Sequence, residues 1–310
     1  MARQEKQWKK WIVAALLLSI LMIFTITAAF LYSIILGDTP IDGNVALISI
    51  RGVLLVDKSR GFATGQVASS SDIVDLIKAA DESPNIKAML IDINSPGGSP
   101  LASQEIADAL KKSNKTIVAV IRETGASGAY WVASAADKIY ASKNSIVGSI
   151  GVIGSYIEYA GLMDRYNLTY RRLVSGAYKD AGSPFKRLSD DESALIQSRL
   201  DVIYTNFVDV ISTNRNLSLE KVIKIADGFV MLGEEAKQAG LIDEIGGRDE
   251  AIEYIQNKLN ITAEIRKFKT APTLADLFGD VSSSASYYIG KGLADGILGA
   301  QTESRLQFIS

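Results

Sequence analysis

The sequence predicts an α/β fold built from parallel βαβ units. Short β-branched runs alternate with segments of helical apolar spacing, an order that favours parallel strands joined by helices. The Ile- and Val-rich runs lack the polar alternation of a half-exposed strand, which indicates burial on both faces. We expect strands at Ala46–Ile50, Lys87–Ile93, Thr116–Ile121 and Lys138–Ala141, with helices at Asp72–Ala80 and Leu101–Lys112.

The later part of the chain adds more helices. Ser189 and Glu192 have the spacing of a capping box, which predicts a long helix ending near Arg215. Two further helices are expected at Glu234–Ala239 and Asp249–Lys258. The resulting division of the chain is a basic flank at 1–11, an apolar segment at 12–36, a linker at 37–44, an α/β domain at 45–270 and a tail at 271–310. For the tail, a partly helical and a disordered state stay open.

The segment Ile12–Leu36 contains no charged residue and is long enough for a membrane-spanning helix. Basic residues precede it and Asp38 and Asp42 follow it, so the positive-inside rule puts the N-terminus in the cytoplasm. A cleaved signal peptide is the alternative, but its apolar region would be shorter and end in a small-residue cleavage site. We expect an uncleaved single-pass anchor in the lipid of the cell membrane, with the domain outside the cytoplasm.

Two absences narrow the chemistry. The 310 residues include no cysteine, which excludes a thiol nucleophile, a disulfide and a cysteine zinc site. They include no histidine, so a Ser-His-Asp triad cannot form within the chain. A net charge of −2 gives nucleic-acid binding no support, and we expect no metal and no cofactor. A hydrolytic site must therefore use a lysine, a carboxylate or a terminal amine as its proton acceptor.

Two glycine-containing turns could present main-chain N–H groups to a ligand. Residues 94–100, Asn-Ser-Pro-Gly-Gly-Ser-Pro, lie between an expected strand and an expected helix, where free N–H groups favour negative charge. Residues 125–130, Gly-Ala-Ser-Gly-Ala-Tyr, also follow a strand and open a helix, so Ser127 could act as a nucleophile. Local sequence alone favours an ordinary βα turn for the first segment and a plain N-cap serine for the second.

A third segment, residues 175–185, follows the strand-like Thr169–Val174 and holds Lys179 among small and apolar residues. The pKa of a free lysine is about 10.4, so its amine is protonated at neutral pH. Burial disfavours the charged form, and a neutral amine could accept the hydroxyl proton of Ser127. Asp180 would oppose this unless its carboxylate points away. A solvated loop lysine is the alternative.

Together these three motifs resemble signal peptide peptidase A, a serine–lysine protease family of bacteria and archaea. The similarity extends from about Val45 to Ile252 and includes the segments 148–152, 227–228 and 240–247 in the same order. The resemblance implies that Ser127 is the nucleophile and Lys179 the general base. It also implies that the N–H groups of Gly98 and Gly128 form the oxyanion hole, with the glycine before Gly98 as a less favoured donor. Ser149 is a candidate for orienting Lys179.

The resemblance further implies a crotonase/Clp-protease-like fold of stacked ββα units. A single copy of the site motifs is typical of the short members, which assemble into homo-oligomeric rings. In these rings the serine of one subunit pairs with the lysine of its neighbour. The implied reaction is endopeptidase cleavage, through an acyl-enzyme, of remnant signal peptides left in the membrane, with small or aliphatic residues in the cleft.

Two other functions fit parts of the sequence. A crotonase-type hydratase or thioesterase acting on coenzyme A esters would use the same glycine-built oxyanion hole, but its catalytic groups are usually carboxylates on soluble cytoplasmic chains. A catalytically inactive scaffold that binds membrane proteins is the second alternative. Labelling of Ser127 by a fluorophosphonate would favour a peptidase over a hydratase.

Overall fold

The computed structural model describes residue 11 and residues 15–28, 43–57 and 66–269. Residues 15–28 form a helix whose side chains are exposed. Among the described residues, no helix combines the length and the apolarity needed to cross a membrane. Residues 12–14 and 29–36 of the expected anchor lie outside the described residues, as do most of the linker and the whole expected tail at 271–310.

A parallel sheet forms the body of the molecule. Its strands follow the order β10-β1-β4-β5-β6-β9, and every neighbouring pair along this path is parallel. The bounds are β1 Val45–Arg51, β4 Ala88–Ser95, β5 Thr116–Ala126, β6 Lys138–Ala141, β9 Glu244–Ile245 and β10 Ile265–Phe268. The four strands expected from the sequence are confirmed, and so is the mixed α/β class.

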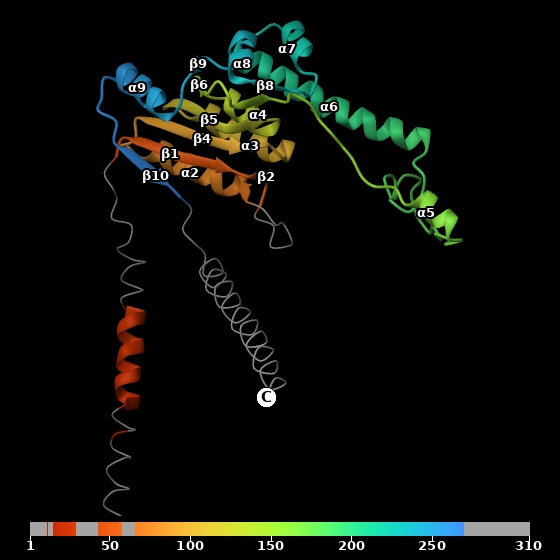
Figure 1. Cartoon of the computed structure of the whole chain (residues 1–310), viewed down its shortest axis with the longest axis horizontal. Helices are drawn as coiled ribbons and strands as arrows, with labels where there is room; N and C mark the ends of the chain where they lie inside the picture. The colour runs from red at the N-terminus through yellow and green to blue at the C-terminus, as the bar shows by residue number, and fades with distance from the viewer. Residues whose placement is uncertain (1–10, 12–14, 29–42, 58–65, 270–310) are drawn as a thin grey trace, which may run out of the picture.

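Helices cover both faces of this sheet (Figure 1). One face packs against α2 Ser70–Glu82, α3 Pro100–Lys112 and α4 Gly128–Ser134, and the larger apolar core lies between them. The other face packs against α9 Arg248–Leu259 through a smaller core that includes Leu90 and Val118. Strands with an apolar core on each side explain the continuous Ile and Val runs.

Several short elements complete the body. The strand β7 Ile146–Gly148 pairs with β5 on one side and with the antiparallel β8 Val230–Leu232 on the other. The strands β2 Val53–Leu55 and β3 Val67–Ser69 form a separate two-stranded sheet. The helix α7 Leu219–Ile225 precedes β8 in the chain, and α8 Gly233–Ala239 follows β8 and contacts it. Gly240 ends α8 in the left-handed conformation.

Residues 153–189, here called the arm, extend away from the body. The long helix α6 Asp190–Arg215 begins at the capping box of Ser189 and Glu192, as predicted. Figure 1 shows the short helix α5 Ala160–Arg165 at the outer end of α6, far from the sheet. The expected strand-like Thr169–Val174 is wrong, because this stretch forms no strand. Its β-favouring residues have no neighbouring strand among the described residues with which to pair.

Candidate active site

Ser127 lies at the junction of β5 and α4 in a strained conformation. Its φ is 52° and its ψ −127°, a region that costs a residue other than glycine about 1–3 kcal/mol. Ser127 occupies the N-cap position of α4, but its side chain makes no capping hydrogen bond. The interpretation of Ser127 as a plain N-cap therefore fails, and its hydroxyl is left for another role.

Hydrogen bonds on both sides hold this conformation. The N–H of Ser127 donates to the carbonyl oxygen of Gly148 over 2.7 Å. The carbonyl oxygen of Ser127 accepts from the N–H groups of Tyr130 and Trp131 over 2.9 and 3.1 Å. Because β7 and the first turn of α4 fix the backbone together, the strain of Ser127 persists in the folded chain.

The glycine turn after β4 packs directly against Ser127. A Cβ atom on Gly97 would lie 2.9 Å from the Cβ of Ser127 and 2.7 Å from the nitrogen of Gly128. A Cβ atom on Gly128 would lie 3.4 Å from the nitrogen of Gly98. The two expected oxyanion donors and the expected nucleophile are thus brought together, although their motifs are about thirty positions apart in the chain.

The N–H groups of this turn have different partners. That of Gly97 donates to the Oγ of Ser95 over 3.1 Å, so it is not available to a substrate. Within the part of the chain that the structure describes, the N–H groups of Gly98 and Gly128 donate to no acceptor. Gly98 has a φ of 157°, and a Cβ atom there would lie 2.2 Å from the carbonyl oxygen of Leu54, so only glycine fits.

A cavity of about 110 Å³ opens beside Ser127, Gly98 and Gly128. Its walls are apolar and come from α4, the start of the arm and α6. The Trp131 and Phe207 rings stack with their centroids 4.9 Å apart, and Val152, Ile153 and Ile203 are among the other residues that line the cavity. A space of this size next to a nucleophile would take one small or aliphatic side chain.

Ser149 directly follows Gly148, whose carbonyl oxygen accepts the N–H of Ser127. It also has a positive φ, of 52°. Its N–H donates to the carbonyl oxygen of Phe229 over 3.0 Å, and its hydroxyl donates to the carbonyl oxygen of Gly228 over 3.0 Å. The Asp-Gly motif at 227–228 therefore lies next to Ser149 and is bonded to it through Gly228. In this chain the hydroxyl of Ser149 is bonded to main chain and does not contact Lys179.

Lys179 lies apart from these groups. It is exposed and belongs to the loop between α5 and α6. Figure 1 shows α5 at the outer end of α6. The N–H of Lys179 donates to the carbonyl oxygen of Gly176 over 3.2 Å, whereas its side chain pairs with none of the described residues. It does not line the cavity beside Ser127. The burial that a proton-accepting lysine needs is therefore absent in the single chain.

The carboxylate of Asp180 is engaged elsewhere. It accepts hydrogen bonds from Arg172 over 2.6 and 2.9 Å, and the Nζ of Lys186 lies 3.4 Å away. The hydrogen bonds from Arg172 hold the pKa of Asp180 below its usual range. Lys186 also bonds Glu192 at the start of α6, and this bond lowers the pKa of Glu192. Asp180 thus fixes the shape of the loop and is not an ion-pair partner of Lys179.

Sequence reasoning missed the supporting residues. Ser103 on α3 is buried, donates its hydroxyl to the carbonyl oxygen of Ser99 over 2.9 Å and contacts Gly128 so closely that a Cβ there would lie 2.2 Å from its Oγ. Trp131 and Phe207 were also not singled out as cavity walls. No local sequence pattern predicts the contact of Ser103 with Gly128 or the cavity wall of Trp131 and Phe207, because both depend on which helices pack together.

Comparisons with known proteins point to one group of peptidases. The sequence pattern of peptidase family S49 matches residues 109–262. A protease candidate of Methanocaldococcus jannaschii is 31% identical over 298 residues, which cover 93% of this chain and 94% of that protein. A signal peptide peptidase A candidate of Enterococcus faecium is 30% identical, covering 81% and 72%. Protease 4 of Haemophilus influenzae is 30% identical over 71% of this chain and 35% of its own length.

Proposed function

Because the chain belongs to peptidase family S49 and is a serine peptidase of the signal peptide peptidase A type, we propose that Ser127 is its nucleophile and Lys179 its general base. One observation carries the first assignment. Ser127 has a strained backbone and an uncapped hydroxyl, and it lies against two main-chain N–H groups that have no acceptor among the described residues. This combination is what a preorganised acyl-transfer site requires.

In the proposed reaction the neutral amine of Lys179 takes the hydroxyl proton of Ser127 as its Oγ attacks the scissile carbonyl carbon. The N–H groups of Gly98 and Gly128 donate to the oxyanion that forms. Collapse of the tetrahedral intermediate breaks the peptide bond, and the ammonium of Lys179 returns a proton to the leaving amine. Water then attacks the acyl-enzyme with Lys179 again as base, which releases the acid and restores Ser127.

Lys179 reaches Ser127 from a neighbouring subunit in this proposal. The arm that carries it is rich in exposed apolar side chains, with Ile153 85% and Leu173 96% exposed. Apolar surface of this extent is typical of an interface. If copies of the chain assemble into a ring, the arm of one covers the Ser127 site of the next. The same contact removes the lysine from water, and desolvation favours its neutral form.

The proposed substrates are remnant signal peptides in or at the membrane. An apolar cavity of about 110 Å³ beside Ser127 suits the small and aliphatic residues of such peptides.

Helix 15–28 is exposed and apolar on all sides, which supports an anchor in membrane lipid over 12–36 with the domain outside the cytoplasm. Deleting 12–36 should move the chain from the membrane fraction to the soluble fraction, and unchanged fractionation would contradict the anchor.

The full chain in detergent provides the test of the catalytic pair. A fluorophosphonate should label the wild type, and Ser127→Ala should abolish both labelling and hydrolysis of an apolar peptide. Lys179→Ala should lower kcat/KM by about 10²–10⁴-fold, the usual contribution of a general base. Lys111→Ala, which changes an exposed lysine on α3, is the matched control and should leave the rate unchanged. Full activity in Lys179→Ala would rule out the assignment of the base.

A further inference from the structure

A second pocket, of about 480 Å³, lies at the edge of the sheet between β1 and α2. None of its lining residues lines the cavity beside Ser127. The ladder between β1 and β10 ends at the pair Ile48 and Phe268, whereas β1 continues to Arg51. Within the described chain, the last residues of β1 therefore extend past β10, and Ser49 and Arg51 line the pocket.

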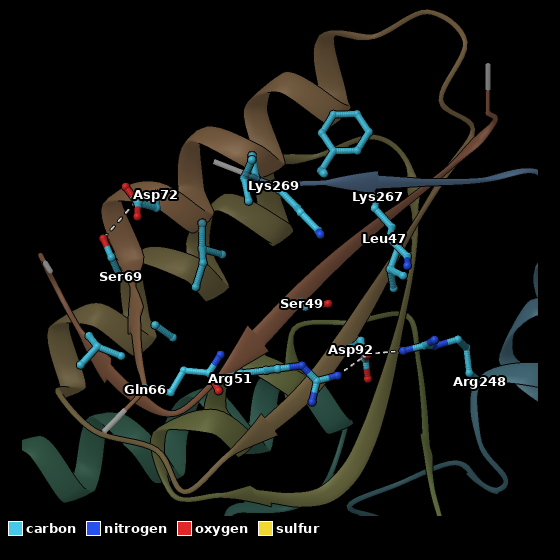
Figure 2. Close-up of a pocket in the computed structure, with 15 residues that line it drawn as sticks. Leu47, Ser49, Arg51, Gln66, Ser69, Asp72, Asp92, Arg248, Lys267 and Lys269 are labelled. Atoms are coloured by element: carbon cyan, nitrogen blue, oxygen red, sulfur yellow. Dashed lines mark hydrogen bonds and ion pairs between the residues drawn. The ribbon is translucent and has the colours of Figure 1, made fainter. Parts of the chain in front are cut away.

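The pocket has a surplus of positive charge. Asp92 of β4 is fully buried at its base, and Arg51 donates to its Oδ2 over 2.9 Å. Arg248, at the start of α9, bonds the same oxygen. Figure 2 shows both guanidinium groups reaching Asp92 from opposite sides, while Lys267 and Lys269 extend from the end of β10 over the same space.

These cations exceed the carboxylates that face them. Four basic side chains line the pocket, and Asp72 and Asp92 are its only acidic lining residues among those the structure describes, which leaves two positive charges in excess. Arg122 also approaches Asp92, with its Nε 3.8 Å from Oδ1. A single carboxylate thus bonds two guanidinium groups and lies near a third, so it cannot neutralise all of them.

Part of this donor capacity is unused. The Nε of Arg248 is buried and has no hydrogen-bond partner among the described residues. The side chains of Arg51 and Arg248 are each 35% exposed, and both line the pocket. Planar guanidinium groups bind carboxylates through paired N–H donors. The geometry therefore favours a bound carboxylate at this point.

Part of the pocket lining is apolar. Leu47, Leu76 and Phe268 belong to this part, so a ligand that fills the space has an apolar body beside its anionic group. Beyond the last pair with β10, no described strand pairs with this edge of β1, so Ser49–Arg51 offer main-chain groups to an extended chain, the arrangement by which sheets add a peptide strand. One ligand chemistry satisfies all three features: a short apolar peptide that ends in a carboxylate.

We propose that this pocket binds the free C-terminal carboxylate of an apolar peptide. The carboxylate lies between Arg51 and Arg248, under the field of Lys267 and Lys269, and the peptide's last side chains pack on Leu76 and Phe268. Every cut by a peptidase creates one new C-terminal carboxylate, so cleavage of apolar segments would produce such ligands. Binding itself does not need the catalytic pair, and its failure would leave the proposed function untouched.

The test is a binding measurement on the full chain in detergent, with Ser127→Ala so that the probe is not cleaved. The probe is N-acetyl-Ala-Leu-Leu with a free carboxylate, and its control is the same peptide as the C-terminal amide. Calorimetry should give a dissociation constant at least about tenfold lower for the acid, since charge-assisted pairing is lost in the amide. Equal affinities for acid and amide would overturn the proposal.

A pair of charge variants locates the site. Lys267→Gln combined with Lys269→Gln removes two exposed cations from the pocket and should weaken binding of the acid about three- to tenfold. Lys111→Gln combined with Lys112→Gln removes two exposed cations from the end of α3 and should leave binding unchanged. If both pairs weaken the acid equally, the effect is one of net charge and the assigned pocket is wrong.

Discussion

The N–H of Ser127 donates to the carbonyl oxygen of Gly148 over 2.7 Å, and this bond ties the candidate nucleophile to β7. The next residue after Gly148, Ser149, is in turn bonded to the carbonyl oxygens of Gly228 and Phe229 beside β8. The strained backbone of Ser127 is therefore supported by two strands that come from distant parts of the chain. Such support keeps the hydroxyl of a nucleophile in one position before substrate arrives.

The contact between Gly128 and Ser103 predicts a coupled pair of substitutions. In Gly128→Ala the new Cβ would lie 2.2 Å from the Oγ of Ser103, so α3 or α4 must shift. We expect a loss of about 1–3 kcal/mol in the free energy of unfolding, as overpacked cores show. Denaturant unfolding of the full chain measures it.

Removing the obstructing oxygen should restore much of this loss. Ser103→Ala leaves the Cβ at 3.3 Å and takes away the closest atom. The double variant should therefore be more stable than the sum of the two single effects allows, with a coupling of about 0.5–3 kcal/mol. Strict additivity would show that the two residues do not press on one another.

The cavity beside Ser127 predicts which substrates are cleaved. Ile203→Ala removes one apolar wall, so substrates with a larger residue before the scissile bond should gain relative to those with alanine. The ratio of the two kcat/KM values should rise by about tenfold or more, the effect of a few methylene groups in a pocket. Val202→Ala, an exposed neighbour on the same helix, should leave this ratio unchanged.

Acid should loosen the loop that carries Lys179. Asp180 and Glu192 have folded-state pKa values below the ordinary range, because Arg172 and Lys186 bond their carboxylates. Their contribution to stability is present above the ordinary carboxyl pKa values of about 3.9–4.3 and is lost as the pH falls from there through the lower folded values. Hydrogen exchange of residues 172–192, corrected for intrinsic rates, should increase over this range relative to the sheet.

A variant separates this network from general acid unfolding. Asp180→Asn removes the charge that Arg172 binds, so the loop should exchange faster already at neutral pH and respond less to acid. Protection of residues 172–192 that stays constant in the wild type down to pH values where the sheet unfolds would contradict the role given to these carboxylates.

The sequence was sufficient for the framework of the fold. The four expected strands, the helices on either side of them and the capping box of Ser189 all have local signals, and each is present. The turns that hold Gly98 and Ser127 were also predicted, because each follows a strand and opens a helix. Parallel neighbours put the ends of β4 and β5 at one edge of the sheet, which brings the two turns together.

Local sequence patterns did not predict contacts between segments that are distant in the chain. The strands β7 and β8 are three residues each, too short for a periodic signal, yet they hold Ser127 and Ser149. Thr169–Val174 has the composition of a strand but lacks a neighbour. The position of Lys179 relative to Ser127 depends on how the arm is oriented, and no local pattern encodes that orientation.

Mixing two inactive variants tests the central claim most directly. Ser127→Ala and Lys179→Ala chains, each with its own affinity tag, are co-expressed and purified through both tags in turn. If Ser127 of one subunit uses Lys179 of its neighbour, random assembly restores about a quarter of the sites. The hydrolysis rate should then reach about a quarter of the wild-type rate. Co-assembly of the two chains without any recovered hydrolysis would contradict a catalytic pair shared between subunits.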